Sequence, residues 1–171
     1  MKKLSLVASL LLLSSSTAFA ESNSIKEAFA NGKVSGDITG FYKSEDNKTG
    51  DDAGFSNGSI GLGFETGTIN GFSSKAAFRA NHEFSEEEES DWDGDFENKS
   101  LLTELYVQYS NDNLTATVGR QEIDLEWLGD YNEAAVLAVT AIPDTTIVLG
   151  YTNRQAASYE TESGDFADFE D

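Results

Sequence analysis

The chain alternates hydrophobic and polar residues over most of its length, which predicts β-strands with one apolar face. In segment 72–84, for example, Phe78 and Phe84 share one face, whereas the other face carries Lys75 and Arg79. One of the predicted strands is apolar on both faces, so the pattern leaves its register open. The seven strands predicted in this way are 33–43, 57–66, 72–84, 101–110, 114–122, 133–141 and 145–155.

A short amphipathic helix is predicted before the strands, within residues 21–32. Ser24 and Glu27 have the spacing of a capping box, and Gly32 is a suitable stop. Ile25 and Phe29 fall on one face. Because a helix of three turns is not stable alone, we expect it to dock on the strands.

Residues 1–20 read as a secretory signal peptide. Lys2 and Lys3 precede an apolar run, and Ala18 to Ala20 form an A-x-A cleavage site. The run is about half of the ~20 residues that a membrane-spanning helix needs, which makes a retained anchor the weaker alternative. The predicted organisation is therefore signal peptide 1–20, helix 21–32, strands 33–155 and an acidic loop or truncated tail 156–171.

Long and short connections alternate along the chain. The long ones are 44–56, 85–100 and 123–132, and the short ones, which contain turn residues, are 67–71, 111–113 and 142–144. Twenty-four of the thirty-one acidic residues lie in or beside the long loops and the tail. Both features are typical of outer-membrane barrels, in which turns and loops lie on opposite sides of the membrane.

Alternation alone does not decide which face meets solvent. In a soluble protein the apolar face forms the core, whereas in a membrane barrel it meets lipid and the polar face lines a lumen. The signal peptide, the loop pattern and small residues such as Gly61 and Gly63 on the polar face favour the barrel. The alternative is a secreted acidic β-sheet protein that acts in surface contact or adhesion and binds Ca²⁺.

Composition excludes several classes of protein. The formal net charge of −20 opposes binding to nucleic acid. Without cysteine there is no disulfide, thiolate metal site or cysteine nucleophile, and His82 is the only histidine. His82 falls on the apolar face near a strand end, where an interfacial ring is the simple interpretation. No residue pattern predicts an enzyme.

Charged residues on the polar face are the candidates for lining a pore. They are Lys43, Lys75, Arg79, Glu104 and Arg154. In the alternative interpretation, these cations are neutralised by acidic residues of the same face, namely Asp37, Glu65, Glu83 and Glu104. Arg120 falls on the apolar face, so either Gly119 forms a bulge or the strand has ended there.

Alternating carboxylates at Asp91, Asp93 and Asp95 are a candidate Ca²⁺ site, the one cofactor that the residues suggest. The segment lacks the spacing of an EF-hand loop, and a solvated acidic loop explains the same pattern. No other cofactor is expected.

Several short motifs resemble the N-terminal part of Opr-type outer-membrane porins, which are related to the OprD family and are common in ε-proteobacteria. They are Ile25 to Phe29, Gly32 to Gly36, Gly63 to Gly67, Val118 to Glu122 and Tyr151 to Gln155. The resemblance implies a large barrel for passive diffusion, compatible with a homotrimer at full length. It also implies that the segment from Gln121 to Tyr131 narrows the pore, with Glu122, Asp124 and Glu126 as constriction residues.

Members of this family are much longer, so the resemblance covers only their opening third. Seven strands cannot close a barrel without bare edges in lipid, so a truncated chain is expected. An eighth strand over residues 156–166 is the alternative, although its carboxylates oppose it. We therefore predict an outer-membrane porin or its N-terminal fragment, exported by a Sec-type route and cleaved near Ala20. Its partners would be membrane lipid and small hydrophilic solutes or ions.

Overall fold

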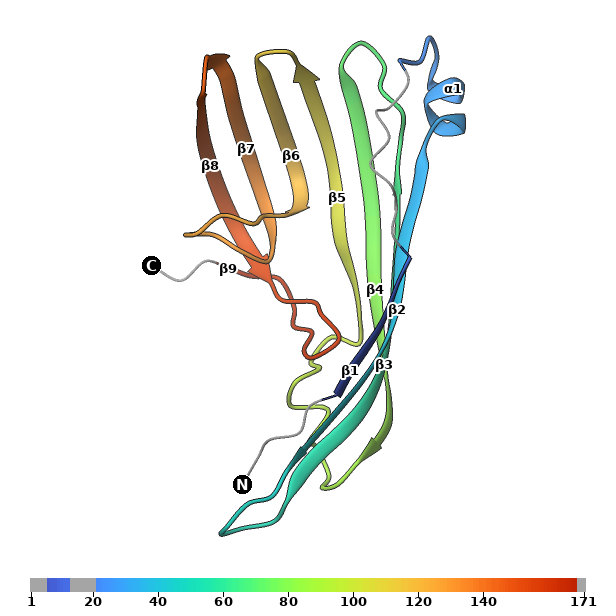
Figure 1. Ribbon diagram of the computed structural model, residues 1–171, viewed down its shortest axis with the longest axis vertical. Coiled ribbons are helices and arrows are strands. Elements are labelled where there is room, and N and C mark those ends of the chain that lie inside the picture. The colour runs from blue at the N-terminus through green and yellow to red at the C-terminus, as the bar shows by residue number, and fades with distance from the viewer. Residues whose placement is uncertain (1–5, 13–20, 169–171) are drawn as a thin grey trace.

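A computed structural model describes residues 6–12 and 21–168 and contains one antiparallel sheet (Figure 1). Its strands follow the chain order β1 to β9, and each pairs with the next. The strands are β1 Leu6–Leu12, β2 Lys33–Glu45, β3 Ala53–Glu65, β4 Phe72–Glu86, β5 Ser100–Asn111, β6 Leu114–Glu122, β7 Tyr131–Ile142, β8 Thr145–Ala156 and β9 Ala167–Asp168, and the helix is α1 Ile25–Ala30.

Strands β2 to β8 confirm the predicted all-β class and its seven strands with a short helix. Within the described part of the chain the two edge strands, β1 and β9, do not pair, so the sheet is a curved and open part of a barrel. Of the predicted signal peptide, residues 6–12 lie antiparallel along β2. Its other residues lie outside those described, so cleavage near Ala20 stays a prediction.

The sheet has inverse polarity: its polar face is covered and its apolar face is exposed, the reverse of what a soluble protein shows. On β3 the polar residues Asn57 and Ser59 are 1% and 3% exposed, whereas Ile60 and Leu62 are each 45% exposed. The same alternation runs through β2 and β4, where Ile38 and other large apolar side chains are open. The polar face is therefore the covered, concave one, and the apolar face is convex.

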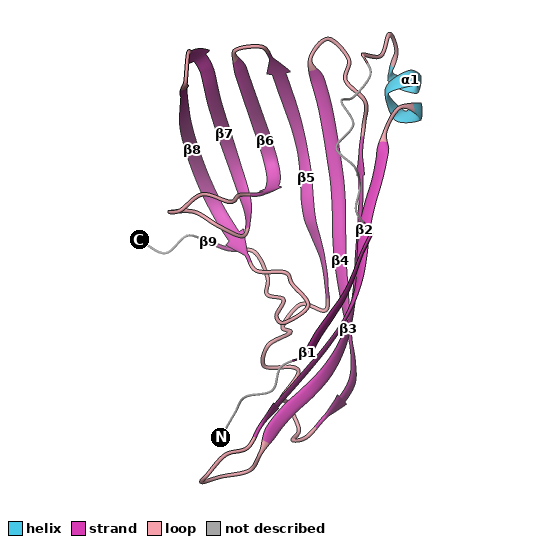
Figure 2. Cartoon of the chain, in the orientation of Figure 1, coloured by secondary structure: helices cyan, strands magenta, loops and turns pink. Residues whose placement is uncertain are grey.

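The helix α1 docks at the end of the sheet where the short turns lie (Figure 2). Ser24 caps it by accepting a hydrogen bond from the Glu27 amide at 3.2 Å. The amide of Gly67, in the turn between β3 and β4, donates to the Ala28 carbonyl at 2.8 Å. Phe29 stacks on Phe64 with the ring centroids 5.7 Å apart. Among the described residues, no helix has the length and apolar character to cross a membrane.

The turns and loops separate to opposite ends of the sheet, as the sequence predicts. In Figure 1 the β3–β4, β5–β6 and β7–β8 turns are at the top, and the β2–β3 and β4–β5 loops are at the bottom. The tight turns contain residues in the left-handed backbone conformation, including Asn70 at φ 49° and Asp144 at φ 57°. We refer to the two ends as the turn end and the loop end.

Candidate functional site: the concave wall and its inward loops

A two-pronged ion pair crosses the concave face from β2 to β4. Arg79 donates from Nη2 to Asp37 Oδ1 at 2.7 Å and from Nη1 to Asp37 Oδ2 at 2.9 Å, and Nη1 also reaches Ser59 Oγ at 2.7 Å. The pair passes over Gly61 of the intervening strand. A Cβ there would lie 2.5 Å from Asp37 Oδ1 and 3.0 Å from Arg79 Nη2, so only glycine leaves room.

A second ion pair lies beside the first. Lys75 Nζ on β4 is 2.6 Å from Glu104 Oε2 on β5, and the two side chains are 23% and 9% exposed. The register of these strands shifts between Ala77 and Phe78, which leaves Thr103 as an extra residue in β5. Thr103 and Glu104 are consequently both buried, and Thr103 donates to the Ala77 carbonyl at 3.1 Å. Lys75 and Arg79 are therefore neutralised by carboxylates of the same face, which is the second of the two interpretations that the sequence allows.

Lys43 lies on the same face, nearer the loop end. Its ammonium is 5.7 Å from the centre of the Phe55 ring and 3.7 Å from Asp95 of the β4–β5 loop. Lys43, Lys75, Arg79 and Glu104 thus share the concave face, as the alternation predicts. A small polar cavity of about 210 Å³ adjoins Asp37, Arg79, Glu104 and Tyr131.

Arg154 does not share that face. The β7–β8 register shifts between Glu133 and Ala134, so that Ala134 pairs with Thr152 and Glu133 pairs with Arg154. The extra residue, Asn153, moves Arg154 to the convex face. The prediction that Arg154 lies on the same face of the sheet as Lys75 is therefore wrong, because an alternating pattern does not reveal a β-bulge.

On the convex face Arg154 joins Arg120, whose placement the sequence left open. Arg120 pairs directly with Leu105 on β5 and with Glu133 on β7, which puts all three on one face. Arg120 is 2.8 Å from Glu133 Oε1, and Arg154 Nη1 is 3.8 Å from Glu133 Oε2. Gly119 adopts φ 128° just before Arg120, a backbone conformation that suits glycine.

The β4–β5 loop folds inward over the concave face, which the sequence analysis missed. Trp92 and Phe96 are 2% and 1% exposed and stack at 4.8 Å, with Phe55 packed against Phe96. Trp92 Nε1 donates to Asn57 Oδ1 at 3.1 Å, and Asn57 Nδ2 donates to Asn81 Oδ1 at 2.9 Å. The sequence feature that could have indicated this inward fold is the i, i+4 spacing of two large aromatic residues, Trp92 and Phe96, within an acidic loop.

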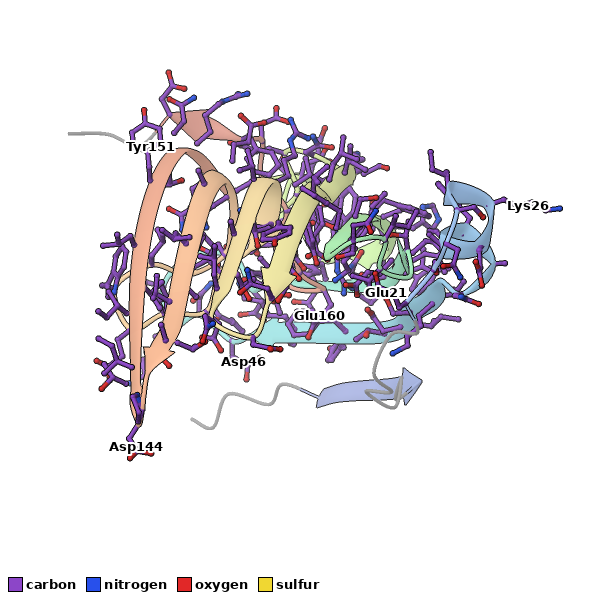
Figure 3. All side chains as sticks on the ribbon, turned by 90° about the horizontal axis from the view of Figure 1, so that it is seen from above. Glu21, Lys26, Asp46, Asp144, Tyr151 and Glu160 are labelled. Carbon is purple, nitrogen blue, oxygen red and sulfur yellow. The ribbon has the colours of Figure 1, made fainter. Side chains whose placement is uncertain are left out.

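The segment after β8 also turns inward, as Figure 3 shows for Glu160, which lies within the curve of the sheet. The Glu160 carbonyl accepts from Asn57 Nδ2 at 3.0 Å. The Ser163 amide donates to the Asp95 carbonyl at 2.9 Å, and the Asn98 amide donates to the Ser163 carbonyl at 3.0 Å. Segment 157–166 and loop 87–99 therefore form one hydrogen-bonded layer on the concave face, the inward layer.

The predicted constriction loop lies over a different part of the wall. Ile123 and Leu128 are buried against Ala134. Gly150 pairs with Val136, which in turn pairs with Thr117 of the concave face, so Gly150 belongs to that face. A Cβ added at Gly150 would lie 3.7 Å from Trp127, which therefore lies over the concave face. The three carboxylates predicted to narrow the pore are all exposed, namely Glu122, Asp124 and Glu126. Glu122 is the last residue of β6. Their role in narrowing a pore stays a prediction.

The three carboxylates predicted to bind Ca²⁺ do not converge. Asp91 accepts from the amides of Gly54 and Glu88 at 2.8 and 3.1 Å. Asp93 pairs with Lys99 at 2.9 Å, and Asp95 lies 3.7 Å from Lys43. In residues 6–12 and 21–168 no three histidine or carboxylate groups are arranged to hold a metal ion.

Tyr159 anchors the inward layer at the start of β7. Its hydroxyl donates to Asp130 Oδ1 at 2.8 Å. Burial raises the pKa of this hydroxyl above its ordinary value, and the hydrogen bond to the Asp130 carboxylate raises it further. The phenol is therefore a neutral donor at physiological pH.

Comparison with known proteins adds one finding about family. A family model described as Gram-negative porin matches residues 6–170, which is nearly the whole chain. No curated protein and no solved structure matches the chain. The OprD-related subtype and the homotrimer stay predictions.

Proposed function

The chain belongs to the Gram-negative porin family, and from that premise we propose that β2 to β8 form part of the wall of an outer-membrane channel. Small hydrophilic solutes and ions would pass along the concave face by passive diffusion, and no catalysis is involved. The observation that carries the proposal is the inverse polarity of the sheet, with Ser59 covered and Ile60 open. A wall between water and lipid needs this arrangement.

Aromatic residues at both ends of the convex face support the membrane placement. At the turn end Phe72 and Tyr109 contact each other with ring centroids 4.9 Å apart. Toward the loop end His82 and Phe84 meet edge to face at 5.7 Å. Rings at the two membrane surfaces are typical of outer-membrane barrels.

The charges of the wall and loops support a preference for cations. Asp37 and Glu104 neutralise Arg79 and Lys75, so the wall has little positive charge to offer an anion. The loops, by contrast, carry many carboxylates, including the run from Glu86 to Glu89. Converging carboxylates raise the local concentration of cations at the entrance. The inward layer and loop 123–130 would together narrow the passage.

Cysteine scanning tests this proposal cleanly, because the chain has no cysteine of its own. The full chain would be placed in lipid vesicles with one spin label at residue 35, 60 or 62. We expect a label at 35 to collide mainly with a water-soluble nickel complex, and labels at 60 and 62 mainly with oxygen dissolved in lipid. The reversed pattern, or a chain that remains dispersed without detergent, would support the secreted soluble protein instead.

A further inference from the structure

Helix α1 carries an exposed apolar side at the turn end of the sheet. Ile25 and Phe29, one helical turn apart, are 72% and 58% exposed. Ala28, on another side of the same helix, is buried. Neighbouring apolar side chains that stay exposed together mark a surface that contacts a membrane or another protein.

The position of the helix is fixed by the turn that follows β3. The Gly67 amide donates to the Ala28 carbonyl at 2.8 Å, and the Ser22 amide donates to the Thr68 carbonyl at 2.7 Å. Asn31 Nδ2 also donates to Ser22 Oγ at 3.1 Å. A helix of six residues is not stable alone, so these bonds determine where its apolar side points.

The apolar side of α1 is continuous with the convex face of the sheet. Phe29 stacks on Phe64 of β3, with the ring centroids 5.7 Å apart. Phe64 pairs with Val34 of β2, which is 67% exposed on the same face. A Cβ at Gly32 would collide with the Phe64 ring, so glycine there allows the ring to lie under the helix. The apolar convex surface therefore extends from the strands onto α1.

Charged residues flank this apolar side. Lys26 is exposed and extends away from the sheet (Figure 3). Glu27 turns back toward the start of the helix and accepts from the Asn23 amide at 2.8 Å. An apolar side with a lysine beside it is typical of helices that lie in a membrane interface, where the lysine ammonium reaches the headgroups.

We propose that α1 lies in the membrane interface of the periplasm-facing leaflet, where its partner is the phospholipid surface. Ile25 and Phe29 would lie among the first acyl carbons, because interfacial helices bury their apolar side by about 5–10 Å. The choice of leaflet rests on the proposed function, since barrel turns lie on the periplasmic side. Phospholipid is favoured over a second copy of the chain because Phe29 contacts Phe64, so the helix continues the face that lipid covers.

Spin-label collisions in the full chain, placed in phospholipid vesicles, test the proposal. One label is placed at residue 25 or, as the matched control, at residue 23, which is exposed just before the same helix. A label at residue 25 leaves the stack of Phe29 on Phe64 intact. We expect the ratio of oxygen collisions to nickel-complex collisions to be several-fold higher at residue 25 than at residue 23. Equal ratios, or a label at residue 25 that meets neither reagent because protein covers it, would overturn the proposal.

Quenching by brominated phospholipid provides a second measure, of depth. Ile25→Trp adds a tryptophan to a chain whose own tryptophans, Trp92 and Trp127, lie on the concave side. We expect bromine close to the headgroup to quench the added emission more than bromine near the ends of the acyl chains. Asn23→Trp should be quenched much less by either lipid. Stronger quenching by deep bromine, or equal quenching of the two variants, would contradict an interfacial helix.

The labels at residues 60 and 62 separate this proposal from the proposed function. If they meet oxygen while the label at residue 25 meets the nickel complex, the channel wall stands and the interfacial helix fails. If all three meet the nickel complex, both proposals fail.

Discussion

Arg79 on β4 holds Asp37 on β2 across the width of an intervening strand, with Nη2 to Oδ1 at 2.7 Å and Nη1 to Oδ2 at 2.9 Å. Both side chains are mostly buried, at 14% and 25% exposure. Three strands are thereby joined by side chains as well as by the backbone ladder. The contact depends on Gly61, which lies beneath it.

The first prediction concerns that glycine. Gly61→Ala should lower the free energy of unfolding by about 1–3 kcal/mol, because the added Cβ would lie 2.5 Å from Asp37 Oδ1. Gly40→Ala is the control, since no atom lies within 4 Å of a Cβ there. Urea unfolding in micelles measures both variants. Equal midpoints would show that the ion pair can shift without cost.

The second prediction concerns the inward layer. Asn57→Ala removes the acceptor of the buried Trp92 indole, which costs about 1–3 kcal/mol when a donor is left unpaired. In a Trp127→Phe background, Trp92 is the only tryptophan, and we expect its emission to shift to longer wavelength as the loop opens. Ser56→Ala, at the neighbouring residue of β3, should leave the emission unchanged. An unshifted spectrum in both variants would mean that aromatic stacking alone holds the loop.

Much of this fold could be predicted from the sequence, because alternation depends on the two-residue period of a strand. The ends of β4 and β6 agree with their predicted bounds within two residues. The shift beside Glu133 could not be predicted, since a single extra residue has no composition signal, and it reversed the placement of Arg154. The inward fold of Trp92 depends on the distant residue Asn57. Local pattern does not encode that contact.

The third prediction concerns ion selectivity. Replacing Glu86 to Glu89 with glutamine should weaken the preference for cations at low salt, because these carboxylates concentrate cations at the entrance. The difference from the unchanged chain should fade as salt rises, since charges are screened over about 8 Å at physiological ionic strength. Reversal potentials across planar bilayers under a salt gradient measure it.

The wall cations provide the matched comparison for that experiment. Neutralising Lys75 and Arg79 should strengthen the cation preference, because Glu104 and Asp37 would lose their partners. A reversal potential that responds to neither set of changes would contradict the assignment of loops to the entrance and of the concave face to the passage.

The fourth prediction concerns pH. The pKa of Tyr159 is raised in the folded chain, so its contact with Asp130 contributes stability that is complete below the ordinary tyrosine pKa of about 10. This contribution is lost as pH rises through the folded-state pKa. A spin label at residue 162 should become more mobile as pH rises through this raised folded-state pKa, well above the ordinary tyrosine value. In Tyr159→Phe the label should show no such step, and a step that persists would assign the change to another group.

The inverse polarity of the sheet also bears on how related sequences can diverge. Lipid chains adapt to any apolar shape, so convex positions such as Ile60 and Leu62 should exchange freely among aliphatic and aromatic residues. Concave positions are coupled, because Asp37 and Arg79 satisfy each other and Gly61 provides the space between them. Across homologues, substitutions on the convex face should therefore accumulate one at a time, whereas those at the ion pair should occur together.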